Sequence, residues 1–138
     1  MKKIIIFITV FIFCSCISGC SNDNQKTTWN MEYIQGKDGE VIYCSKENKN
    51  IYPNADIKNI ICILEKTYIT IRNKDTGEEW MGSCKKIDKD NKSMIYEVKF
   101  DDNKTGNLVK SFTKYENNTQ HDTLIISSGE YSLNLTIQ

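Results

Sequence analysis

Alternation of apolar and polar residues is the feature that most constrains what this chain folds into. It is clearest in residues 93–100 and 130–137. The apolar positions of these two stretches are Met94, Tyr96, Val98, Phe100, Tyr131, Leu133, Leu135 and Ile137. Successive side chains of a β-strand point to opposite faces of the sheet, so each stretch predicts a strand with one buried face.

Short turn-rich segments separate the alternating stretches. Residues 67–73 and 78–87 flank the sequence Lys-Asp-Thr-Gly, which predicts a hairpin with Gly77 at a positive φ. The whole pattern gives about eight strands at a spacing of roughly 8–12 residues, typical of an all-β fold. We expect an antiparallel up-and-down meander that closes into a barrel, because closure removes exposed strand edges. Eight strands leave an interior wide enough for side chains or one small ligand.

We expect the first strand to pair with the last strand. Trp29, Met31 and Tyr33 alternate with polar residues and are predicted to share the inner face.

Residues 54–64 fit two patterns. Their apolar positions match a helical template, and Asn54 is a suitable cap. Those positions are Ile57, Ile60, Ile61 and Leu64. The same stretch is rich in β-branched isoleucine, which favours a strand. We expect a helical turn near 54–58 followed by a strand, and at most one short helix near 54–64.

The first residues have the pattern of an export signal. Lys2 and Lys3 precede residues 4–13, which are apolar except for Thr9. This run is shorter than the roughly 20 apolar residues that a membrane-spanning helix needs. It has the length of the apolar region of a signal peptide.

The tetrapeptide Ile17-Ser18-Gly19-Cys20 resembles the lipobox of bacterial lipoproteins. The resemblance implies cleavage after Gly19 and a lipid on Cys20. It divides the chain into a signal peptide at 1–19, a lipidated polar tether at 20–28 and a domain at 29–138. It also implies a protein held by its lipid on the extracytoplasmic face of the cell membrane. The alternative is a secretory peptide that is cleaved elsewhere and leaves no lipid.

The early strand at Trp29, the hairpin at residues 67–87 and the final alternating strand resemble small bacterial lipocalin-like lipoproteins of the calycin type. The resemblance covers most of residues 29–138 as a rhythm of strands and turns. It implies a lipocalin-like β-barrel that holds a small ligand. Six aromatic residues are candidates to line its cavity: Trp29, Tyr33, Trp80, Tyr96, Phe100 and Tyr131. The alternative is that the aromatic residues fill the interior.

Charge and cysteine content exclude several functions. The chain has 18 basic and 18 acidic residues without a basic cluster, so we expect no nucleic-acid partner. One histidine and the absence of a Cys-x-x-Cys motif argue against a metal site, and nothing predicts a cofactor. If a disulfide forms, we favour Cys44–Cys62, which closes a loop of about 18 residues. Cys62 is equally consistent with a buried apolar side chain.

Two functional classes remain after catalysis is set aside. His121 has no accompanying nucleophile motif, so we expect that the protein is not an enzyme. The first class is a small binding module for an apolar or amphipathic ligand at the cell surface. The alternative is a tethered protein-interaction or inhibitor domain of the cell envelope with a filled barrel. The expected partners are therefore the membrane, through the N-terminal lipid, and an unknown small ligand or envelope protein.

Overall fold

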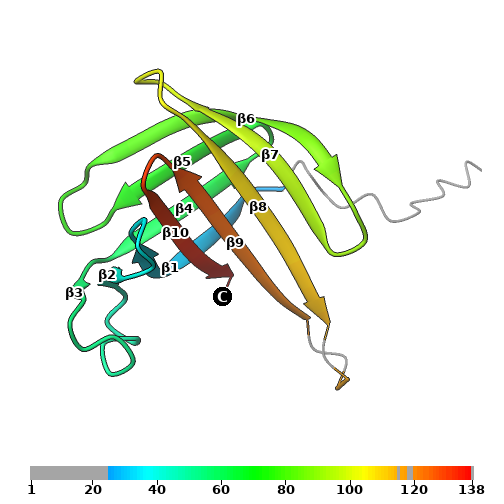
Figure 1. The fold of residues 1–138 in the computed structure, drawn as a ribbon. Helices are drawn as coiled ribbons and strands as arrows, with labels where there is room; N and C mark the ends of the chain where they lie inside the picture. Colours follow the sequence, from blue (N-terminus) through cyan, green and yellow to red (C-terminus); the bar gives the residue numbers. More distant parts are fainter. Residues whose placement is uncertain (1–24, 115, 118–119, 138) are drawn as a thin grey trace, which may run out of the picture.

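The computed structural model describes residues 25–114, 116–117 and 120–137, which form ten β-strands and no helix (Figure 1). The strands are β1 (Thr27–Gln35), β2 (Val41–Cys44), β3 (Asp56–Ile57), β4 (Ile60–Glu65), β5 (Tyr68–Asn73), β6 (Glu79–Lys89), β7 (Ser93–Phe100), β8 (Thr105–Lys114), β9 (Gln120–Ser128) and β10 (Tyr131–Ile137). Within this part of the chain, no helix has the length and apolar character to cross a membrane. The signal peptide predicted at 1–19 and the predicted lipid attachment site, Cys20, lie outside the described residues.

Eight of these strands close into an antiparallel up-and-down barrel, as the alternation predicts. Strands β4 to β10 pair in sequence order, and β1 closes the circle between β10 and β4. The two extra strands, β2 and β3, continue from the edge of β1 outside the closed ring. In Figure 1 they lie at the lower left, beside β1.

The seam between β1 and β10 brings the two ends of the domain together. Trp29 lies opposite Ile137, and Met31 lies opposite Leu135. Trp29 is completely buried, and its indole Nε1–H donates a hydrogen bond of 3.0 Å to the hydroxyl of Thr27. Strand β1 starts at Thr27, so the last two residues of the predicted tether belong to the barrel.

The barrel core is formed by inward-facing residues of seven of the eight barrel strands, while the eighth, the long β6, contributes the partly buried Cys84. The buried members are Trp29, Met31, Ile60, Cys62, Ile69, Ile71, Val98, Leu108, Leu124, Ile126, Leu133 and Leu135. Burial of this apolar surface is the main favourable term in folding. These buried members all lie within residues 29–135.

One end of the barrel is closed by an unusual inward-facing lysine. The Lys110 ammonium lies 5.5 Å from the centre of a Trp29 ring and 5.3 Å from the centre of the Phe112 ring. A cation over an aromatic face is attracted by the negative face of the ring. These three side chains fill the end of the barrel at which β1 begins, and we call this the closed end.

Two inward-facing glycines allow the wall to bend sharply. A Cβ on Gly82 would lie 2.7 Å from the backbone carbonyl oxygen of Lys99, and one on Gly106 would collide with the carbonyl oxygen of Ser127. Neighbouring strands approach too closely at these points for any side chain. Glycine inside a strand is therefore a requirement of barrel closure here.

A bulge in β1 corrects the predicted inner face of the first strand. The register shifts between Met31 and Tyr33, so Tyr33 lies opposite the outward-facing Asn134, and Ile34 takes the inner position opposite Leu133. A β-bulge adds one residue to one strand and reverses the alternation beyond it. Trp29 and Met31 face inward as predicted, but Tyr33 does not.

The short helix expected near 54–64 does not form. Residues 53–54 make a turn, β3 follows, and Ile60 begins β4, which pairs with β1 and β5. Ile60 and Cys62 are buried in the core, with Ile61 between them facing outward. Pairing on both edges of a β-branched segment outweighs its helical spacing, so only the predicted strand is confirmed.

The expected disulfide between Cys44 and Cys62 is also absent. The three described cysteines, Cys44, Cys62 and Cys84, are free thiols. Cys62 pairs with Trp29 and faces the barrel interior, whereas Cys44 pairs with Tyr33 and faces outward. A disulfide cannot join side chains on opposite faces of a sheet. Cys62 is instead the buried apolar residue of the alternative interpretation.

Replacement of Trp29 by alanine should cost about 3–5 kcal/mol of unfolding free energy, because it leaves a cavity in the core at the closed end of the seam. Urea denaturation of the chain from residue 21 to 138 measures this loss. Trp80→Ala is the matched control, since Trp80 is 39% exposed, and it should lose less than half as much. Equal losses for the two variants would mean that burial at the seam does not govern stability.

The buried thiols should make the barrel less stable in alkali. Burial raises the pKa of Cys84 to about 11 and raises the pKa of Cys62 further, whereas an unfolded thiol has a pKa near 8.5. Between these values the unfolded chain binds fewer protons than the native barrel, so stability falls as pH rises. Urea midpoints from pH 8 to 10 should fall less steeply for a Cys62→Ala, Cys84→Ala double variant. Parallel slopes would show that the thiols play no part.

Candidate binding site

The barrel is open at the end opposite to Lys110 and Trp29. We call this end the mouth; it is ringed by the turns that follow β1, β5, β7 and β9. These turns lie towards the left of Figure 1, whereas β1 begins on the right. The long β6 runs from the mouth to the closed end, so both ends belong to one continuous wall.

An apolar cup of about 390 Å³ lies in the mouth. Its lining includes Ile34, Tyr43, Ile71, Trp80, Phe100 and Tyr131. The floor is formed by core residues, among them Ile126, which is only 3% exposed. Core residues therefore lie directly beneath the cup.

The six aromatic residues predicted to line a cavity divide into three groups. Trp80, Phe100 and Tyr131 line the cup. Trp29 is buried at the seam, and Tyr96 packs against the core. Tyr33 lies outside the barrel, where its ring centre is 5.3 Å from that of Tyr52. Burial raises the pKa of Tyr33, and the neighbouring Tyr52 and Glu32 raise it further.

Ile34, Ile42 and Tyr43 are among the lining residues of the cup that were not identified from the sequence. Ile34 faces inward because of the bulge before Tyr33, which alternation alone does not reveal. Ile42 and Tyr43 belong to β2, whose place beside β1 is set by pairing across the turn. The Gly39 turn, at a φ of 84°, was the available signal for that hairpin.

Charges at the rim of the cup are neutralised within the chain. The ammonium of Lys104 lies 3.2 Å from the Asp102 carboxylate, and Lys37 lies 3.8 Å from Glu130. The backbone N–H of Lys104 also donates to Asp102, and this hydrogen bond lowers the pKa of that carboxyl. The hydroxyl of Ser128 donates to the carbonyl of Thr105. The polar side chains that line the cup, those of Asp102, Lys104 and Ser128, are therefore already partnered.

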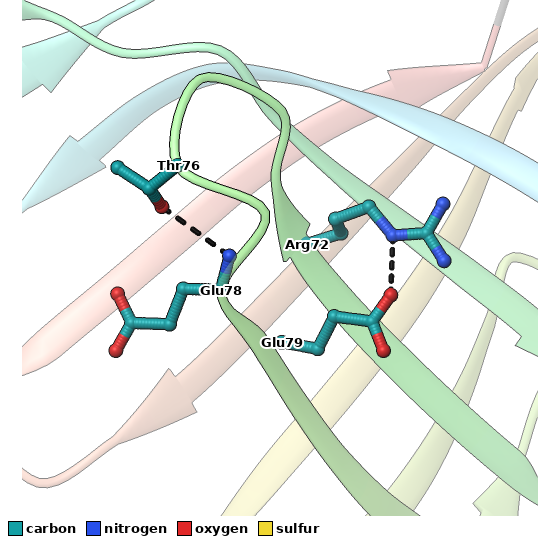
Figure 2. A network of polar contacts seen from close by, with 4 residues as sticks. All are labelled: Arg72, Thr76, Glu78 and Glu79. Atoms are coloured by element: carbon teal, nitrogen blue, oxygen red, sulfur yellow. Dashed lines mark hydrogen bonds and ion pairs between the residues drawn. The ribbon is translucent and has the colours of Figure 1, made fainter.

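The side chain of Arg72 lies on the outer face of the β5–β6 hairpin. Its Nε donates to the carboxylate of Glu79 across the two strands, and the backbone N–H of Glu78 donates to the hydroxyl of Thr76 in the turn (Figure 2). Ile71 and Trp80, the next residues along, pair with each other and face the cup. This outer network holds the hairpin that carries Trp80.

Other motifs of the sequence have local structural roles. Asp90 accepts hydrogen bonds from the backbone N–H groups of Lys92 and Ser93, so residues 88–93 make a tight turn. His121 is exposed near the start of β9. Among the described residues, no three His, Cys, Asp or Glu side chains are grouped to hold a metal ion.

The cup is thus an apolar recess at the mouth of the barrel. No protein-family model, no curated protein and no solved structure matches this chain. What the protein binds is inferred from the geometry and chemistry of its own residues.

Proposed function

We propose that the protein is a small binding module that holds an apolar or amphipathic ligand in the cup, and that a lipid on Cys20 anchors it to the extracytoplasmic face of the cell membrane. The observation that carries the first half is an apolar recess above a packed floor. The lipobox resemblance of residues 17–20 carries the second half. Neither half requires a cofactor or a catalytic group.

The size and chemistry of the cup suit a small molecule. Its volume of about 390 Å³ lies within the range of roughly 300–1,000 Å³ that is usual for ligand pockets. Aromatic and aliphatic side chains provide the lining, and each square ångström of apolar surface removed from water contributes about 25 cal/mol. Because the rim groups are already partnered, an apolar ligand enters without leaving a buried charge unpaired.

The direction of β1 determines whether the cup would point towards or away from the membrane if the protein is anchored through Cys20. The chain enters the barrel at the closed end, where Thr27 pairs with Leu64, and the mouth is at the other end. Six residues lie between Cys20 and Thr27, and as a flexible tether they would reach roughly 13 Å. The anchored barrel would stand close to the membrane with its mouth directed away, and so would take its ligand from the surrounding medium.

The exposed rim supports a second candidate, the tethered protein-interaction domain. Tyr131 is 58% exposed and Trp80 is 39% exposed at the edge of the cup. Exposed aromatic residues around a recess are also typical of surfaces that bind an apolar side chain of another protein. An envelope protein is the partner that this alternative implies.

Binding in the cup should be lost when a charge is placed on its rim. N-phenyl-1-naphthylamine is a suitable uncharged probe, since its fluorescence rises in apolar surroundings. Tyr131→Asp should weaken its binding about tenfold, or 1.4 kcal/mol, because a carboxylate there opposes burial of an apolar molecule.

Tyr68→Asp is the matched control for this experiment. Tyr68 is 66% exposed and lies on the outer face of β5, opposite Ser83, so the same substitution should leave probe binding unchanged. Failure of the native protein to bind any apolar probe, together with capture of an envelope protein that Tyr131→Asp abolishes, would favour the interaction domain instead.

The anchor makes a separate prediction. In the native host, Cys20→Ser should leave the protein unprocessed or released from the membrane, since two or three acyl chains give stable attachment. Membrane fractionation and mass spectrometry of the N-terminus measure both outcomes. An unmodified mature N-terminus at another residue would rule out the lipid anchor.

A further inference from the structure

A second, polar pocket of about 440 Å³ adjoins the cup. It exists because β1 has two partners along one edge. Strand β4 pairs with residues 27–30, and β2 pairs with residues 33–35. A recess lies where these two partners diverge. It is lined by the segment that includes Lys46 and Lys58, and by the β5–β6 turn, which carries Lys74.

One contact links the linings of the cup and the polar pocket. Tyr43 lines the cup and Lys58 lines the polar pocket. The Lys58 ammonium lies 3.9 Å from the centre of the Tyr43 ring. A positive charge of the polar pocket is thus held against an aromatic residue of the cup.

The polar pocket has unpaired positive charge. Lys46 and Lys74 are exposed, and neither ammonium forms an ion pair within the described residues. Two carboxylates, Glu47 and Asp75, also line the pocket. Asp75 already accepts a hydrogen bond of 3.2 Å from the backbone N–H of Asn59. The lining of the polar pocket therefore has three ammonium groups and two carboxylates, and one of these carboxylates already accepts a hydrogen bond.

We infer that the ligand of the cup is an anionic amphiphile, whose apolar part occupies the cup while its carboxylate or phosphate group reaches past Tyr43 to Lys58. This inference rests on the proposed function and adds the class of ligand. Lys58 is the member of the trio that contacts Tyr43 of the cup, and its stacking on that ring leaves its N–H donors available to an anion. The positive charges of Lys46 and Lys74 add to the electrostatic attraction of an anion towards Lys58.

Head-group preference tests this inference. Decanoate, decyl phosphate and decanol share one apolar chain, so displacement of N-phenyl-1-naphthylamine from residues 21–138 compares their head groups alone. At low ionic strength, at least one anion should bind about fivefold more tightly than decanol, and 0.2 M salt should reduce this difference. Lys58→Gln should remove the preference while leaving decanol affinity within about twofold.

Two controls separate charge from packing. Lys58→Arg keeps a cation that stacks on Tyr43 and should retain the preference. Lys104→Gln removes a lysine that also lines the cup but is paired with Asp102, and should change nothing.

The inference is overturned if decanol binds as tightly as both anions, or if Lys58→Gln keeps the preference; the cup then remains a site for uncharged ligands. If none of the three compounds nor the probe binds, the proposed function itself fails.

Discussion

The pairing of β1 with β10 is the constraint on which the rest of this structure depends. It joins the first and last strands of the domain, so no other contact is more distant along the chain. Without it the sheet would have two long exposed edges, and Trp29 would lose its cover. The seam is reinforced at the bulge, where Glu32 accepts a hydrogen bond of 2.7 Å from the hydroxyl of Thr136 and a second from the side-chain amide of Asn48. One residue thus ties β10 and the 45–55 loop to β1.

Alternation predicted the barrel because its period is a property of each strand by itself. Residues 93–100 are an example, since Met94 and Val98 are buried, Tyr96 packs against the core and Phe100 lines the cup. The pattern was misleading where a strand changes register with its partner. The bulge after Met31 moved Tyr33 outward, and residues 54–64 became strand because two neighbours were available to pair with them. Both outcomes are decided by residues distant in the sequence, which no local period can encode.

The candidate site depends even more than the fold on pairings between residues that are distant in the sequence. Trp80, Phe100 and Tyr131 were recognisable as aromatic residues on inward faces. The polar pocket, however, arises from the divergence of β2 and β4 along one edge of β1. Lys58 was one of many lysines in the sequence, and only its position 3.9 Å from the Tyr43 ring distinguishes it. A site at the junction of nonlocal pairings can be recognised only once those pairings are known.

Buried and exposed side chains are distributed unequally along the axis of this barrel. The closed end holds the fully buried Trp29 beside Lys110 and Phe112, whereas the lining of the cup includes side chains that are already partly exposed, such as Trp80 and Tyr131. Substitution of a partly exposed side chain removes less buried surface and leaves a smaller cavity. The exposed part of the cup lining can therefore change at little cost to the free energy of unfolding, whereas Trp29 cannot, because it is completely buried. If the cup is the binding site that we propose, substitutions at Trp80 and Tyr131 would change the ligand while the fold is kept.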